Sequence, residues 1–233
     1  MDSDWDRWEK MNCDDMPWLV LQVADSAFPI GGFAHSNGLE SAMKWGELAG
    51  EQRLQRFFRD SLMQVARSCL PMVRATHRGD DFSKVDWLCD RFLNNHVSNR
   101  ASRRQGQALV NTACCVFPFP DLSDRRRMIR QEELPCHLAP AFGWVLATLS
   151  VDEKETLRLF LFMTLRSLIS SAVRLSLVGP LRGQAIQYEL NSYLETVLER
   201  CRGIPLTEVV QTAPVIDILQ ATHDRLYSRL FQS

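Results

Sequence analysis

The sequence lacks the short motifs that mark the commonest catalytic, nucleotide-binding and metal-binding sites. It contains no GxxxxGK(S/T) loop, no HExxH, no CxxC and no G-x-S-x-G. The first absence excludes nucleotide binding through a glycine-rich phosphate loop. The others remove the usual zinc and serine-nucleophile signatures. The sequence therefore predicts no catalytic residue and no metal ligand set.

Strong net charge and alternating strand patterns are also missing. The formal net charge of the 233 residues is −1, so no field of the whole molecule favours nucleic acid or an anionic membrane. No run alternates apolar and polar residues, and no internal repeat is present. These absences favour an all-α protein without a nucleic-acid or membrane partner.

The cysteines show no disulfide framework. There are seven, an odd number at irregular spacings, and no signal peptide is recognisable. Reduced thiols and a cytoplasmic location are expected from this usage.

One long apolar segment is expected to form the centre of the fold. Apolar residues recur at helical spacing from about residue 152 to 178, and Gly179-Pro180 is expected to end the helix. Three arginines, Arg158, Arg166 and Arg174, interrupt this segment and argue against a membrane span. We expect a single compact bundle of roughly ten helices around this buried central helix.

The ends of the chain differ from this body. Residues 1–16 are acidic and lack apolar periodicity, which predicts a flexible arm. Residues 17–233 then form the single domain, and 215–233 form a C-terminal helix or tail. In between, residues 98–130 carry seven arginines against two aspartates, so this stretch is a solvated basic face, a protein contact or a nucleic-acid contact.

Four ordered stretches closely resemble the urease accessory protein UreF family. They are DSAFPIGGFAHSNGLE at 25–40, HLAPAFG at 137–143, SAVRL at 171–175 followed by Gly179, and THDRLYSRLFQS at 222–233. The resemblance covers about residues 17–233. Ser176 departs from it, because many members have glycine there.

The resemblance implies an all-α, non-enzymatic protein that helps to insert nickel into urease. Such a protein joins the UreD/UreH scaffold protein to the GTPase UreG, often as a dimer, in a complex that delivers nickel to apo-urease. No cofactor would be bound stably, since the complex handles the nickel.

The four stretches also supply candidate site residues. The residues expected to bind partners are Phe33, His35, Ser36, Arg174, His223, Tyr227, Arg229, Leu230 and Phe231. The residues expected to shape the backbone or the core are Gly31, Gly32, Gly38, Glu40, His137, Pro140, Gly143 and Gly179. We expect Phe33, His35 and Ser36 at a defined surface, and a tail that contributes little to the folded body.

Two alternative functions remain open at this stage. The chain could bind nickel itself through His35, Cys136 or His137, as a metallochaperone in its own right. It could also be an unrelated helical hydrolase or nucleic-acid adaptor.

Overall fold

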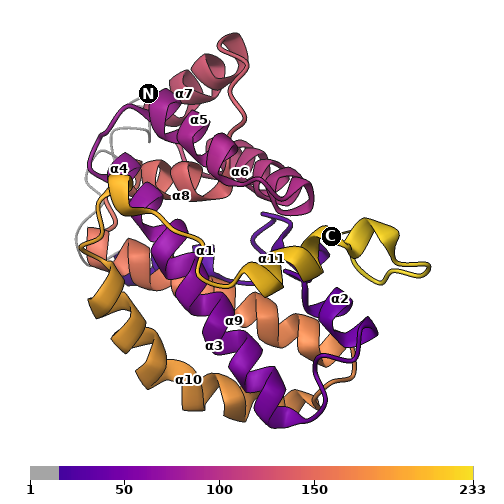
Figure 1. Ribbon diagram of the computed structural model, residues 1–233. Coiled ribbons are helices and arrows are strands. Elements are labelled where there is room, and N and C mark those ends of the chain that lie inside the picture. Colours follow the sequence, from indigo (N-terminus) through magenta and orange to yellow (C-terminus); the bar gives the residue numbers. More distant parts are fainter. Residues whose placement is uncertain (1–15, 233) are drawn as a thin grey trace.

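The computed structural model describes residues 16–232, and that part consists of helices joined by turns and loops, with no strand (Figure 1). The all-α fold of roughly ten helices is confirmed. The expected arm, residues 1–16, lies outside the described residues except for Met16, which begins α1. The helices are α1 Met16–Ala24, α2 Leu39–Lys44, α3 Glu51–Ser68, α4 Leu70–His77, α5 Phe82–Phe92, α6 His96–Val116, α7 Pro120–Gln131, α8 Leu138–Thr148, α9 Glu153–Arg174, α10 Pro180–Cys201 and α11 Pro214–Ala221.

Helix α9 is the central element, as expected. Asp152 caps it by accepting hydrogen bonds from the backbone N–H groups of Lys154 and Glu155. The helix contacts α10, α3, α4, α8, α2 and α1. By length and composition it could cross a membrane, but 61% of its most apolar window is buried inside the protein. That burial is typical of a core helix covered by neighbours on several sides.

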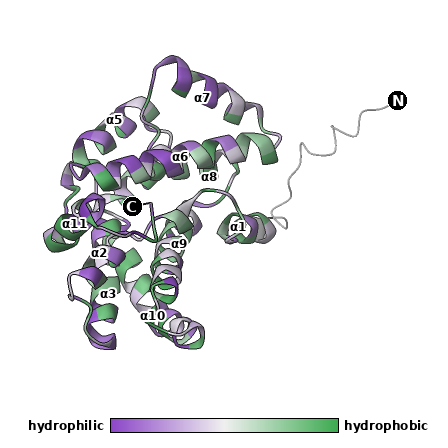
Figure 2. Ribbon diagram, turned by 90° about the vertical axis from the view of Figure 1, so that its right-hand side faces the viewer, coloured by the Kyte–Doolittle hydropathy of each residue, from purple (hydrophilic) through white to green (hydrophobic). Residues whose placement is uncertain are grey.

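The core consists of two apolar clusters that α9 joins. Its first half contributes Leu157 and Leu161 to a cluster shared with α1, α4, α5, α6, α7 and α8. Its second half contributes Leu165 and Leu168 to a cluster shared with α2, α3, α10 and α11. Figure 2 shows α1 at one edge of the molecule beside α9. The two clusters hold α9 along its whole length.

Three of the helices open with a proline. Pro120, Pro180 and Pro214 occupy the first turn of α7, α10 and α11. Proline is favoured there, since its missing N–H would have no helical partner and its φ angle already suits a helix. The expectation that Gly179-Pro180 ends the central helix was therefore wrong, because this pair begins α10.

Helix α9 ends at Arg174, and the turn that terminates it is centred on Ser176, three residues before Gly179. Ser176 has φ +57°, in the left-handed region, and its N–H donates to the carbonyl of Val173. The N–H of Leu177 donates to the carbonyl of Ala172. This pair of bonds is the usual helix-ending motif in which glycine is preferred at the left-handed position.

We expect Ser176→Gly to stabilise the protein. A left-handed conformation costs a residue with a side chain about 1–2 kcal/mol, part of which the freedom of glycine in the unfolded chain offsets. The net gain in the free energy of unfolding should be about 0.5–1 kcal/mol, measured by urea denaturation. An unchanged or lower midpoint would show that the turn is not strained.

Candidate partner-binding site

Three of the four sequence motifs meet at one place in the structure. The 25–40 segment, the end of α9 and the tail after α11 lie together, and the backbone N–H of Gln232 donates to the carbonyl of Ala34 at 2.8 Å. We call this assembly, residues 27–40, 171–175 and 222–232, the composite surface. Figure 1 shows the tail running from α11 back toward α2.

Within the 25–40 segment the chain turns twice before α2. A short 3₁₀ helix spans Gly32–Ala34, and Gly31 before it has φ +75°. Gly38 has φ +84°, and a Cβ atom there would lie 3.3 Å from the Cβ of Gln220 on α11. Gly38 therefore lies close to α11, where a side chain would be crowded. No positive φ angle is found at Gly32 or Gly179.

Glu40, at the start of α2, holds the tail. Its carboxylate is buried and accepts hydrogen bonds from the backbone N–H groups of Leu230 at 2.6 Å and Phe231 at 3.1 Å. Nε2 of His223, which is also buried, lies 3.1 Å from the same carboxylate. Charge-assisted bonds of this kind are among the stronger ones in proteins. One side chain therefore fixes both ends of the tail to α2.

Arg174 joins the other two parts of the composite surface. Its guanidinium donates to the carbonyl oxygen of Phe33 and lies over the ring of Phe231, 4.2 Å from the centroid. The side chain is exposed to solvent, so Arg174 is not a buried charge that only stabilises the core. Arginine combines a planar donor group with a cation that stacks on aromatic rings, and both properties are used here.

Asp224 connects the tail to α6. Its carboxylate accepts hydrogen bonds from Arg100 at 2.9 and 3.1 Å, from Arg229 at 3.2 Å and from His96 at 3.2 Å. Hydrogen bonding by Arg100 lowers the pKa of this carboxyl group. The network adds α6 to the support of the tail.

The composite surface exposes only some of the residues that were expected to bind partners. His35 and Ser36 are buried, so their expected place at the surface was wrong. His223 and Phe231 are buried as well, and the tail is not a helix to Phe231, because α11 ends at Ala221. Phe33 at 69%, Tyr227 at 106% and Leu230 at 53% exposure are the large apolar side chains that remain open. The tail is thus partly built into the body.

Burial lowers the pKa of His35 from its usual 6.5 to about 4, with further contributions from Arg104, Arg100 and His223. The folded protein therefore keeps His35 neutral where the unfolded chain is protonated. Stability from this residue is fully present above pH 6.5 and is lost as the pH falls toward 4.

We expect acidification from pH 7 to 4 to cost up to about 3 kcal/mol through this residue alone. The measurement is the difference in unfolding free energy between the wild type and His35→Gln at each pH. That difference should shrink steadily below pH 6.5. Parallel pH profiles would contradict the buried neutral state of His35.

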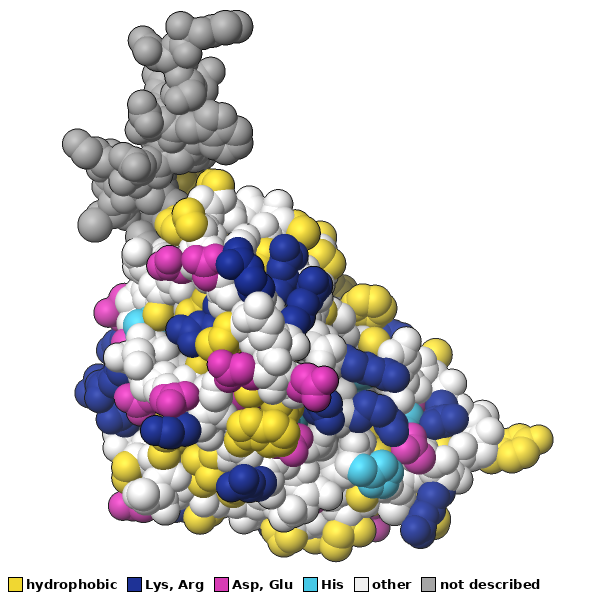
Figure 3. Space-filling view, turned by 90° about the horizontal axis from the view of Figure 1, so that it is seen from above, with side chains coloured by type: hydrophobic (Ala, Val, Ile, Leu, Met, Phe, Trp, Pro, Cys, Tyr) yellow, Lys and Arg dark blue, Asp and Glu magenta, His cyan; other side chains and the backbone are white. Residues whose placement is uncertain are grey.

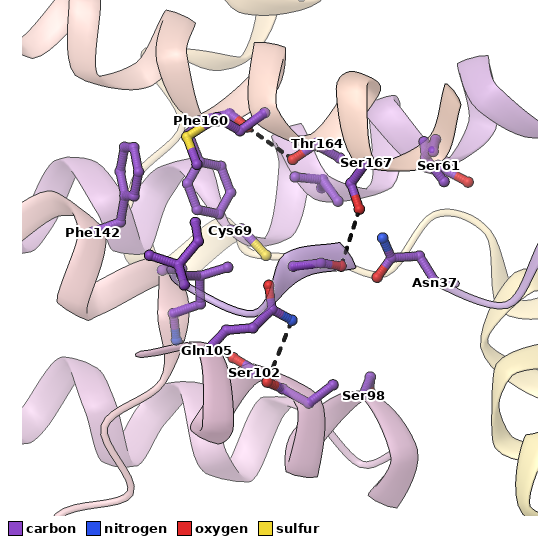
Figure 4. A pocket seen from close by; sticks show the side chains of 18 of the residues that line it. Asn37, Ser61, Cys69, Ser98, Ser102, Gln105, Phe142, Phe160, Thr164 and Ser167 are labelled. Atoms are coloured by element: carbon purple, nitrogen blue, oxygen red, sulfur yellow. Dashed lines mark hydrogen bonds between the residues drawn. The ribbon is translucent and has the colours of Figure 1, made fainter. Parts of the chain in front are cut away.

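A cavity of about 680 Å³ lies beneath the 26–33 loop, between α3, α6, α9 and α11. Figure 4 shows Thr164 and Ser167 of α9 facing Ser98, Ser102 and Gln105 of α6 across it. Ser167 Oγ donates to the carbonyl of Gly32 at 3.5 Å. One side of the loop thus lines this open space.

The fourth motif, residues 137–143, lies elsewhere and serves the core. His137 is fully buried, and its ring nitrogens lie 3.0 Å from Asp90 and 3.1 Å from Ser102. The carbonyl of Pro140 accepts a hydrogen bond from Thr76 at 2.8 Å. The motif therefore fixes the start of α8 against α4, α5 and α6.

The candidate nickel ligands are not brought together. Cys136 and His137 lie before α8, whereas His35 belongs to the composite surface. Burial raises the pKa of the Cys136 thiol to about 12, so the thiolate form that binds metals is disfavoured. In residues 16–232, no three His, Cys, Asp or Glu side chains are grouped so that they could hold a metal ion.

Two contacts that support the site and the core were not predicted from the sequence. Asp224 and Arg100 are 124 residues apart, and nothing in the spacing of either indicates the other. Buried Asp86, which accepts the backbone N–H groups of Cys136 and His137 at 2.6 and 2.7 Å, also went unnoticed. The sequence did contain a signal for the role of Asp86, because an acidic residue on the apolar face of a helix needs a buried hydrogen-bond partner.

Comparison with known proteins agrees with this geometry. The family model described as UreF matches residues 48–191. Urease accessory protein F of Arabidopsis thaliana is 37% identical over 227 residues, covering 94% of this chain and 93% of its own length. The protein of the same name from Oryza sativa subsp. indica is 35% identical, covering 92% and 84%. Urease accessory protein UreF of Yersinia enterocolitica is 27% identical, covering 96% and 100%. The family model covers more than half of the chain and the relatives cover nearly all of it, and the chain belongs to the UreF family.

Proposed function

We propose that this chain is a urease accessory protein without catalytic activity, and that it bridges a UreD/UreH-type scaffold protein and a UreG-type GTPase during nickel insertion into apo-urease. The observation that carries the proposal is the composite surface. It is built from three motifs far apart in the sequence and is held by Glu40 and Arg174. The site offers ordered surface, and its parts suggest no chemical reaction.

The exposed side chains support a protein partner. Phe33, Tyr227 and Leu230 are open to solvent beside Arg174 and Arg229, and aromatic residues with arginine are the types that dominate protein–protein contacts. Because Glu40 and Arg174 already order the backbone, a partner would have little conformational entropy left to remove. We assign the scaffold protein to this surface.

The remaining parts of the proposal concern nickel, location and oligomeric state. Nickel is handled by the assembled complex, and this chain holds no cofactor stably. The complex works in the cytoplasm, and a homodimer of this chain provides two copies of the composite surface. Neither nucleic acid nor a membrane takes part.

The test is a pair of substitutions at the most exposed positions. Phe33→Ser and Tyr227→Ser should each weaken binding to the purified scaffold protein by about tenfold or more, as expected for aromatic anchors of an interface. The melting temperature should not change, because both side chains are exposed. Binding is measured by calorimetry or by co-purification.

The matched control is Tyr188→Ser, a tyrosine that is 78% exposed on α10. Figure 1 shows α10 apart from the tail. It should leave scaffold binding unchanged. Equal losses in all three variants, or no loss in Phe33→Ser and Tyr227→Ser, would overturn the assignment of the scaffold protein to the composite surface.

A further inference from the structure

A basic band crosses the face of the molecule formed by α6 and α7. It consists of Arg100, Arg103 and Arg104 on α6 and Arg125, Arg126, Arg127 and Arg130 on α7. The two helices are in contact, and Figure 3 shows Lys and Arg side chains gathered into a band on this side. The α6 end of the band adjoins the composite surface, because Arg100 and Arg104 line one hollow together with Asp224 of the tail.

Four arginines of the band have no carboxylate partner within residues 16–232. Arg100 pairs with Asp224, Arg127 pairs with Asp124, and Arg125 lies over two aromatic rings. The four for which this part of the chain provides no ion pair are Arg103, Arg104, Arg126 and Arg130.

Some arginines elsewhere in the described residues are paired, whereas others, such as Arg53 and Arg67, are single exposed charges. Arg158 bonds to Glu195, and Arg182 bonds to both Glu51 and Glu189. These pairs tie α9 to α10 and α10 to α3. The band differs in that four arginines without an ion pair lie on two helices that are in contact, so positive charge is in excess there.

The chain itself contains a segment of complementary charge. Residues 1–15 hold six carboxylates against Arg7 and Lys10, a net −4 in a protein whose total is −1. Trp5 and Trp8 stand between these carboxylates, and indole rings stack well on guanidinium groups. Exposed Val116, at the turn from α6 to α7, offers apolar contact beside the band.

Residues 1–15 are also attached close enough to the basic band to reach it. They join α1, and the loop after α1 is fixed to the α6–α7 turn by Phe28, whose ring stacks on Phe117 with centroids 6.1 Å apart. Fifteen extended residues can span about 50 Å. Helix α6, with 21 residues, is only about 32 Å long.

We propose that residues 1–15 dock on the basic band of the same molecule and shield it from other polyanions. Carboxylates pair with the four arginines that lack partners, and the tryptophans stack on guanidinium groups. The contact is electrostatic and exposed, so it weakens with salt.

The test uses the full chain and cleavage by a lysine-specific protease after Lys10, the one lysine of the segment. The band variant carries Arg→Gln at 103, 104, 126 and 130. At low salt, cleavage after Lys10 should be about fivefold slower in the wild type than in this variant, because proteolysis follows the undocked population. The difference should vanish in about 1 M salt.

The matched control removes the same charge from exposed arginines elsewhere, with Arg→Gln at 53, 56, 67 and 200. It should be cleaved at the wild-type rate, and all three proteins should melt alike. Equal rates in the wild type and the band variant would overturn the proposal. Protection of Lys10 that is lost on dilution would also overturn it, because residues 1–15 would then dock on a second copy. Binding of single-stranded nucleic acid to the band of the wild type would overturn it as well, because the band would then be open.

Discussion

Gly143→Ala is expected to unfold the protein or to lower its free energy of unfolding by at least about 3–4 kcal/mol. A Cβ atom at this position would lie 1.9 Å from the carbonyl oxygen of Val73 and 2.4 Å from Oγ1 of Thr76. The first of these atoms is backbone and cannot rotate away. Helices α4 and α8 would have to separate, although both are packed into the larger core cluster.

Urea denaturation followed by circular dichroism measures this loss. Gly179→Ala is the matched control, because Gly179 has φ −73° and a Cβ atom there meets nothing within 4 Å. It should change the stability by less than about 0.5 kcal/mol. A Gly143→Ala protein as stable as this control would show that α4 and α8 do not pack as closely as described.

Glu40→Ala is expected to release the tail from α2. The free energy of attachment of the tail to the helical body should fall by about 3–5 kcal/mol. The change leaves His223 and the backbone N–H groups of Leu230 and Phe231 buried without their acceptor. Most of the tail is not helical, so helical circular dichroism should change little. Trypsin should cut at Arg225 and Arg229 much faster, and scaffold binding should fall with it.

Glu208→Ala serves as the control, because Glu208 is exposed and makes no ion pair with residues 16–232. Its tail should be as resistant to trypsin as that of the wild type. A Glu40→Ala protein with a protected tail and normal scaffold binding would contradict the role of Glu40 as the anchor.

The helical body could be predicted from sequence because local patterns determine it. Apolar spacing located α9 to within a few residues, since a helix surrounded by others must be apolar on most sides. Helix ends were less accurate. Gly179-Pro180 was interpreted as the end of α9 although it begins α10, and Ser176 was not recognised as the residue whose turn terminates α9.

The composite surface was only half predictable. The motifs identified the segments that form this surface. No sequence pattern indicates that the Glu40 carboxylate accepts a hydrogen bond from a backbone N–H group 190 residues away. Nor does an exposed-looking tail reveal that Phe231 is buried under Arg174. Such pairings depend on the tertiary path of the chain, which periodicity does not encode.

Correct residues were therefore assigned to partly incorrect positions. His35 and Ser36 were expected to touch a partner directly, yet they lie beneath the surface and support it. Phe33, two residues earlier, is exposed because the short 3₁₀ helix turns it outward. His35→Ala should therefore mainly lower the stability of the fold, whereas Phe33→Ser should mainly weaken binding to the partner.

Hydrogen exchange of the chain alone and in complex with the scaffold protein tests the central claim most directly. The claim is that residues 27–36 and 222–232 form one partner-binding surface. Exchange should slow in both segments together when the scaffold protein binds, while α5 and α7 remain unchanged. Slowing in the tail without any change in residues 27–36, or slowing confined to other helices, would contradict it.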